Sequence, residues 1–153
     1  MTRFRTLLVC SLLLLATTSL LAADAPKSPS LYTRLGGYNA IAAVTDDFIG
    51  RLAADKQVSR FFVGHSQDSL MKIRQHVVEF LCSATGGPCV YMGRDMKTSH
   101  QGMGITETDW NAAVNDLVAT LDHFKVPEKE KNELIGAVAG FKNDIVDQKT
   151  AMK

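Results

Sequence analysis

The side chains of this 153-residue chain best suited to ligate a metal or move a proton near neutral pH are four histidines, His65, His76, His100 and His123. His100 lies in the polar segment GRDMKTSHQGMGIT, residues 93–106. The glycines that follow it let the backbone turn sharply and present the ring. From this position alone, His100 could cap a helix, lie on the surface or ligate a metal.

Large apolar side chains near His100 in the sequence favour the last of these roles. They are Phe61, Phe62, Met96, Met103, Ile105 and Trp110. An imidazole beside aromatic and methionine side chains, in a chain with helical patterning, suits a haem iron ligand. The same pattern allows a cofactor-free helical protein in which the histidine only caps a turn.

His76 is a second ligand candidate, provided that it faces His100. The helical period places it at the border of an apolar stripe that contains Ile73, Val77 and Phe80. A boundary histidine with one solvated nitrogen fits this pattern equally well.

The other two histidines have simpler explanations. His123 falls near a helix C-terminus, where a cationic imidazole interacts favourably with the helix dipole. His65 falls in a loop. Neither is expected to ligate a metal.

Two cysteines, Cys82 and Cys89, flank the turn SATGGP and could form a disulfide if the backbone reverses there. Closing a loop of about eight residues would stabilise the fold by about 2.5 kcal/mol in the chain-entropy model. An oxidising compartment favours this bridge over two free thiols.

Hydrophobic periodicity predicts one all-α domain with no convincing strand. The expected helices cover SLYTR, a segment from an N-cap at Asn39 to about Leu52, residues 67–84, the segment from Thr106 to about Phe124, and the segment from Pro127 to about Ile145.

Several residues predict how these helices begin and pack. Thr106 and Asp109, in TETD, form a capping-box pattern, and Pro127 suits the first turn of the last helix. Gly136 and Gly140, four residues apart, would let another backbone or a flat ligand approach that helix closely.

Residues 1–23 are predicted to be a secretory signal peptide. They start with two arginines, continue through an apolar run and end in small residues. The apolar run is short for a membrane span, and an uncleaved anchor is the alternative. We therefore expect an exported, periplasmic protein without stable membrane insertion after cleavage. A polar leader (24–30), one domain (31–148) and a C-terminal tail (149–153) follow the signal.

The charge balance argues against a nucleic-acid partner. The chain has 17 basic and 16 acidic residues, and loss of Arg3 and Arg5 with the signal peptide changes the net charge from +1 to −1. A nucleic-acid-binding protein would normally show a basic excess or a basic stripe.

Several motifs occur in an order that resembles the truncated haemoglobins, most closely their first group. They are LYTRLGG, DDF, FF.G, ATGGP, Y.GR.MK..H.G.GIT and an amphipathic helix behind VP, and they span about residues 31–147. The resemblance implies a two-over-two helical sandwich around a b-type haem, with His100 as the proximal iron ligand.

The resemblance also implies roles for other residues. Phe62 would pack on the haem face, and Arg94 and Lys97 would lie near the anionic propionates. Ile73 and Val77 would lie opposite the iron. Two further apolar side chains are expected to complete the haem pocket, namely Ile105 and Trp110.

The distal side departs from the family pattern. Members that hold oxygen tightly or oxidise nitric oxide usually carry a tyrosine directly after the phenylalanine of DDF, where this chain has Ile49. Isoleucine cannot donate a hydrogen bond. The sequence RQH is similar to members whose histidine closes on the iron as a sixth ligand, which makes His76 a candidate distal ligand.

The sequence therefore predicts a haem protein that reversibly binds oxygen or another diatomic gas. One alternative is a six-coordinate bis-histidine haem protein for electron transfer, with a redox partner protein, or for redox or gas sensing. Another is a haem enzyme that acts on nitric oxide or peroxide, which Ile49 disfavours.

Overall fold

The structure is a computed structural model that describes residues 28–147. All regular elements in this range are helical, without strands, as the periodicity predicts. They are α1 (Leu31–Arg34), α2 (Gly37–Ala54), the 3-10 turn η1 (Ser59–Phe61), α3 (Gln67–Ala84), α4 (Met96–His100), α5 (Glu107–His123), α6 (Glu128–Ala139) and α7 (Lys142–Ile145).

The expected signal peptide, most of the leader and the C-terminal tail lie outside the described residues. Among residues 28–147, no helix has the length and apolar character needed to cross a membrane.

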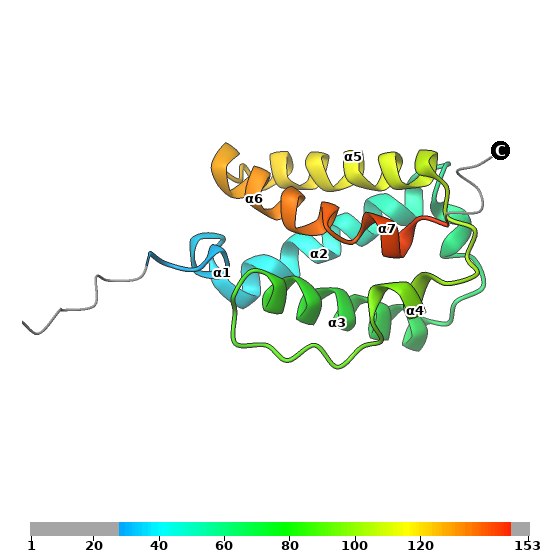
Figure 1. The fold of residues 1–153 in the computed structure, drawn as a ribbon, viewed down its shortest axis with the longest axis horizontal. Coiled ribbons are helices and arrows are strands. Elements are labelled where there is room, and N and C mark those ends of the chain that lie inside the picture. Colours follow the sequence, from blue (N-terminus) through cyan, green and yellow to red (C-terminus); the bar gives the residue numbers. More distant parts are fainter. Residues whose placement is uncertain (1–27, 148–153) are drawn as a thin grey trace, which may run out of the picture.

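The helices form two packed pairs. Helix α2 packs against both α3 and α5, α5 packs against α6, and α4 contacts α7. In Figure 1, α5 and α6 run along one side of the molecule, while α3 and α4 run along the other. This arrangement is the two-over-two sandwich that the sequence predicts.

The helix starts follow local sequence signals, with two differences. Thr106 and Asp109 form the expected capping box at the start of α5. The prediction of an N-cap at Asn39 is wrong, because α2 already begins at Gly37 after Gly36 in the left-handed conformation. Pro127 is the N-cap of α6 and precedes its first turn.

The last predicted helix is divided into α6 and α7. Helix α6 ends at Ala139, and Gly140, a weak helix former, follows it. Phe141 then turns its ring against Phe80, with centroids 5.0 Å apart. At Gly136 a Cβ atom would meet nothing within 4 Å, so no other segment of the described chain approaches the helix closely there.

The main cluster of buried apolar side chains lies at one end of the sandwich. Its most buried apolar side chains include Val78, Leu117, Leu121 and Leu134. Burial of each large aliphatic side chain contributes roughly 1.5–3 kcal/mol. The apolar stripe on α3 that faces the other end, including Ile73 and Val77, is only half-buried. These side chains line a cavity instead.

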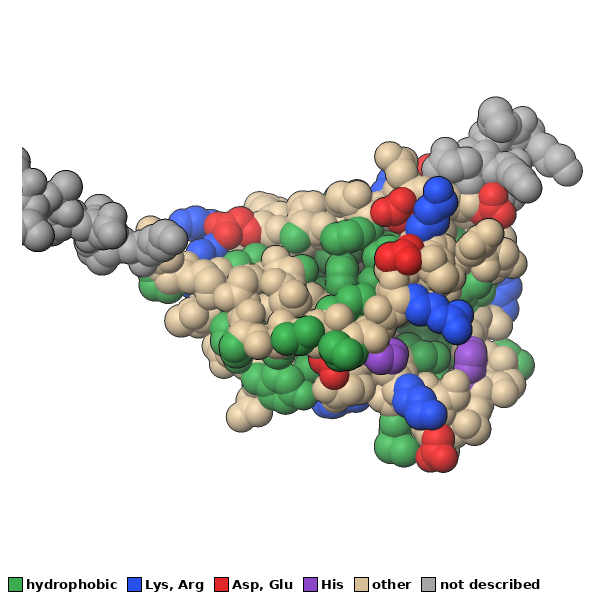
Figure 2. Space-filling model, turned by 60° about the horizontal axis from the view of Figure 1, so that its bottom comes forward, with side chains coloured by type: hydrophobic (Ala, Val, Ile, Leu, Met, Phe, Trp, Pro, Cys, Tyr) green, Lys and Arg blue, Asp and Glu red, His purple; other side chains and the backbone are tan. Residues whose placement is uncertain are grey.

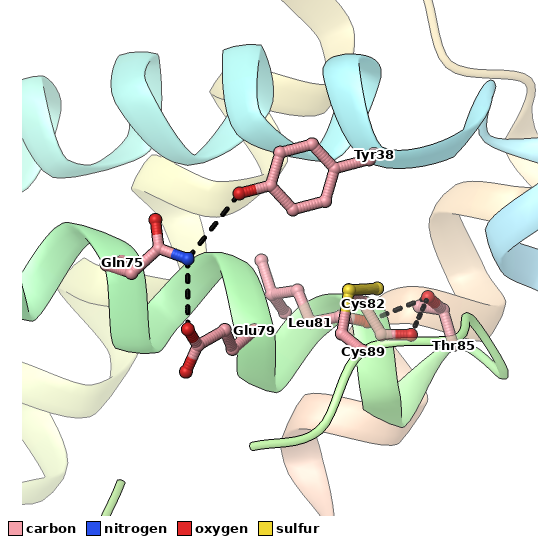
Figure 3. Close-up of a disulfide and its surroundings, with 7 residues drawn as sticks. All are labelled: Tyr38, Gln75, Glu79, Leu81, Cys82, Thr85 and Cys89. Atoms are coloured by element: carbon pink, nitrogen blue, oxygen red, sulfur yellow. Dashed lines mark hydrogen bonds between the residues drawn. A yellow bond between two sulfur atoms is a disulfide. The ribbon is translucent and has the colours of Figure 1, made fainter. Parts of the chain in front are cut away.

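The Cys82–Cys89 disulfide is present and confirms the predicted pairing, with Cα atoms 5.7 Å apart. Figure 3 shows it where α3 ends and the chain reverses. The reversal requires glycine at position 87, since a Cβ atom there would lie 2.7 Å from the carbonyl oxygen of Cys82. The bridge fixes the start of the following extended segment against α3.

Candidate functional site

A large cavity separates the two helix pairs at the end opposite the packed core. It has a volume of about 700 Å³ and is lined by residues from η1 and from every helix from α2 to α7. Figure 2 shows a hollow with an apolar floor and histidine side chains at its edge. The volume falls within the range of about 300–1,000 Å³ that is typical of cofactor sites.

His100 lies at the C-terminal end of α4 and lines this cavity. The helix is short but well capped, since the Asp95 side chain accepts a hydrogen bond from the Thr98 backbone N–H at 2.8 Å. The Nδ1–H of His100 donates to the carbonyl oxygen of Met96 at 2.7 Å. This bond orients the ring and leaves Nε2 as the nitrogen that can bind a metal.

His76 lines the same cavity from α3, with its side chain 47% exposed. Its Nδ1 atom is 3.7 Å from Oε2 of Glu79. Its ring meets the ring of Tyr91 edge-on, at a centroid distance of 6.1 Å. The structure therefore brings His76 and His100 to one cavity, from different helices.

Three aliphatic side chains line the cavity from α2 and α3, the helix that carries His76. Ile49 on α2 and Ile73 and Val77 on α3 all line it. None of these side chains can donate a hydrogen bond. Gln75 does not line the cavity, and its amide instead donates to Glu79 at 2.9 Å.

The apolar residues predicted to contact a cofactor reach the cavity from separate parts of the chain. Phe62 follows η1, while Ile105 and Trp110 flank the start of α5, and all three line the cavity. Ile105 and Trp110 are each only 8% exposed.

The two predicted basic residues differ in position. Arg94 is exposed and lines the cavity. Lys97 is also exposed, but it is not among the cavity-lining residues. Arg94 is therefore the better placed of the two to meet an anionic group at the cavity edge.

Among the cavity-lining residues that were not predicted as site residues, three carry polar groups with hydrogen bonds near the site. His65 lines the cavity, with Nδ1 3.1 Å from Oγ of Ser69. Tyr91 also lines it, and its hydroxyl donates to the carbonyl oxygen of Arg94 at 2.6 Å. The sequence signal for Tyr91 is its place in the histidine motif, but no sequence pattern shows which way its ring turns.

The third is Asp109, which is 1% exposed and joins two walls of the cavity. Its carboxylate accepts hydrogen bonds from Gln57 at 2.7 Å, from Arg60 at 2.6 Å and from the Thr106 backbone N–H at 2.8 Å. Burial alone would raise the pKa of Asp109, but these bonds outweigh it and hold the pKa well below its usual range. The capping pattern TETD identified Asp109 only as a helix-start residue.

These residues fit a haem group. Haem is a flat, largely apolar molecule with two anionic propionates, and it needs an axial ligand, apolar walls and a basic edge. The cavity has His100 with a free Nε2, walls of aromatic and aliphatic side chains, and Arg94 at its edge.

Comparisons with known proteins agree with this fit. Residues 30–147 match the family model described as bacterial-like globin. The chain is 36% identical to the group 1 truncated haemoglobin GlbN of Mycolicibacterium paratuberculosis over 116 residues, which cover 76% of this chain and 83% of that one. It is 34% identical to the Synechocystis group 1 truncated haemoglobin GlbN, over 78% of this chain and 98% of that one.

Solved structures show the same fold. A truncated haemoglobin from Tetrahymena pyriformis in the Fe(III) form matches with a TM-score of 0.72 at 28% identity, over 78% of this chain and 100% of that one. A 2/2 haemoglobin from Synechococcus, in the cyanomet state and with covalently attached haem, matches with a TM-score of 0.71 at 32% identity, over 77% and 98%. The chain therefore belongs to the group 1 truncated haemoglobins and is a globin that binds haem b.

Proposed function

We propose that this protein reversibly binds oxygen or another diatomic gas at a haem whose iron is ligated by His100. When bound, haem supplies an iron atom with a coordination position for such a gas. The residues of the chain hold the haem, orient its ligand and set the polarity of the gas-binding side.

The orientation of His100 is the observation that carries this proposal. Its Nδ1–H is held by the Met96 carbonyl at 2.7 Å, so the lone pair on Nε2 is directed away from the helix backbone. Hydrogen bonding of this kind fixes the tautomer and raises the basicity of a ligating histidine. We assign apolar packing against the haem to Phe62, Ile105 and Trp110, which line the same cavity.

Arg94 supplies positive charge at the cavity edge for the propionates. We assign a smaller share of this role to Lys97, whose exposed side chain comes from the same short helix as His100. On the gas-binding side, Ile73 and Val77 form an apolar wall.

The test is an absorption spectrum of the ferrous haem protein, recorded as oxygen or carbon monoxide is added and then removed. We expect the Soret band to shift on addition and to return on removal. A Soret band that neither gas moves would contradict the proposal.

A second function is favoured by one observation, namely that His76 lines the same cavity as His100. Coordination by both histidines would suit electron transfer, with a redox partner protein, or redox sensing. A six-coordinate ferrous spectrum that is lost in His76→Ala would support this function, and a five-coordinate spectrum in both proteins would leave gas binding as the function.

An enzymatic role with nitric oxide or peroxide has weaker support. Such chemistry benefits from hydrogen-bond donors at the reacting oxygen atoms. The side chains of Ile49, Ile73 and Val77 offer none.

We further propose that the protein is exported to the periplasm. The Cys82–Cys89 disulfide supports this, because disulfides persist mainly in oxidising compartments. Mass spectrometry of the protein from a periplasmic fraction should give a mature N-terminus close to residue 24. An intact N-terminus in the cytoplasmic fraction would contradict export.

A further inference from the structure

A buried carboxylate oxygen without a hydrogen-bond partner lies next to the imidazole of His76, on the same helix. Glu79 is on α3, three residues after His76, and its side chain is 21% exposed. Its Oε2 atom is buried and accepts no hydrogen bond, and it is 3.7 Å from Nδ1 of His76. A buried acceptor without a donor costs about 1–3 kcal/mol. A donor is therefore expected, and Nδ1–H of His76 can supply it.

The other oxygen of Glu79 is held in place. The Gln75 amide donates to Oε1 at 2.9 Å, and the same amide nitrogen is 3.5 Å from the hydroxyl of Tyr38 on α2. Figure 3 shows this chain of side chains between α2 and α3. Because Oε1 accepts the hydrogen bond from Gln75, Oε2 is the oxygen left to accept one from His76.

Glu79 is ionised at neutral pH. The Gln75 amide, which donates to Oε1, holds the pKa of Glu79 below its usual range. An ionised carboxylate accepts hydrogen bonds and donates none. His76 can donate to it through Nδ1, and only when that nitrogen carries a proton.

Tyr91 confines the ring of His76 from another direction. The two rings meet edge-on at 80°, and Tyr91 also packs against Phe80 at a centroid distance of 5.6 Å. The Tyr91 hydroxyl donates to the Arg94 carbonyl, and Cys89, two residues before Tyr91, is bridged to α3. The imidazole therefore has a fixed neighbour in Tyr91 as well as in Glu79.

We propose that Glu79 is a positioning residue for His76, whose imidazole it holds in the Nδ1–H form so that the unprotonated Nε2 is presented to the haem cavity. A distance of 3.7 Å exceeds a hydrogen bond, and a small rotation of either side chain closes it. A carboxylate behind a histidine plays this role at many metal sites. The inference rests on the proposed function and deepens it. It states how the polar side chain of His76 is oriented beside the apolar side chains of Ile73 and Val77 on the gas-binding side.

The test determines which ring nitrogen of His76 carries the proton. The protein is loaded with zinc protoporphyrin, which is diamagnetic and leaves the position opposite His100 open. Two-bond nitrogen–proton NMR spectra are recorded above the titration range of histidine. In the wild-type protein we expect the proton of His76 on Nδ1. In Glu79→Gln we expect the ratio of the Nδ1–H to the Nε2–H form to fall about tenfold, because Nδ1–H loses a charged hydrogen-bond acceptor.

Two further variants serve as controls. Asp68→Asn removes another carboxylate from α3, at the opposite end of the helix, and should leave the ratio unchanged. Glu79→Asp retains the charge and should restore part of the wild-type ratio. A wild-type His76 that carries its proton on Nε2, or a ratio that Glu79→Gln does not change, would overturn the inference.

A different observation tests the proposed gas binding. If carbon monoxide does not shift the Soret band of the iron-loaded wild-type protein, the proposed function is contradicted. The NMR result with zinc protoporphyrin does not depend on gas binding. The two failures are therefore distinguishable.

Discussion

Asp109, at the start of α5, accepts a hydrogen bond from Arg60 at 2.6 Å. Arg60 belongs to η1, directly before Phe61 and Phe62, and its guanidinium also lies over the ring of Phe61 at 4.3 Å. The contact joins the segment that carries Phe62 to the segment that follows His100. Two walls of the haem cavity, 49 residues apart in sequence, are thus held by one buried carboxylate.

Replacement of Asp109 by asparagine should destabilise the protein by about 1–3 kcal/mol. The variant loses the charge that Arg60 and the Thr106 backbone N–H bind, and it leaves buried donors poorly satisfied. Urea unfolding measures the change. Glu107→Gln is the matched control on the same helix end, where the exposed pair with Lys142 should contribute at most about 1 kcal/mol.

The contribution of Asp109 should also depend on pH. Its folded-state pKa lies below the unfolded value, so its stabilisation is complete above about pH 4 and declines as the pH falls further. The difference in unfolding free energy between the wild-type protein and Asp109→Asn should therefore shrink in acid. A difference that stays constant from neutral pH into this range would contradict the assignment.

Removal of the imidazole of His100 should abolish the absorption spectrum of a histidine-ligated ferrous haem. His100→Gly leaves space for free imidazole, which should restore the spectrum when added. His123→Gly is the control, since this histidine is 59% exposed and does not line the cavity. A wild-type spectrum in His100→Gly without added imidazole would exclude His100 as the iron ligand.

Introduction of a donor at position 49 should slow oxygen dissociation. The side chain of Ile49 lines the cavity beside Ile73 and Val77, so oxygen meets no donor on that wall. A tyrosine hydroxyl there should add about 1 kcal/mol, which corresponds to roughly fivefold slower dissociation in stopped-flow measurements. Ile49→Phe tests for the effect of ring size alone, and equal dissociation rates for the two variants would contradict the role of the hydroxyl.

Loss of the disulfide should destabilise the fold by about 2.5 kcal/mol, because the bridge restricts a short loop of the unfolded chain. The double variant Cys82→Ala, Cys89→Ala should unfold at lower urea concentration than the oxidised wild-type protein. Reducing agent should lower the midpoint of the wild-type protein and leave that of the variant unchanged. Equal midpoints for the oxidised wild-type protein and the variant would contradict a stabilising bridge.

Much of the fold follows from local signals that the sequence shows directly. The apolar period over 67–84 predicts α3 with its observed bounds, and Thr106 and Asp109 predict the capped start of α5. These predictions succeed because helix periodicity and capping depend on residues within one or two turns of each other. The helix end at Ala139 was missed because it depends on the packing of Phe141 against Phe80.

The sequence by itself determined the type of fold, the family and the set of residues from which a haem ligand had to come, because these depend on periodicity and on motifs in a fixed order. Only the tertiary structure decided that the two basic candidates differ, since Arg94 lines the cavity and Lys97 is not among its lining residues. It also decided that Glu79 lies behind His76 and that Asp109 joins two cavity walls. Such contacts depend on the directions of side chains from segments far apart in sequence, which no local pattern specifies.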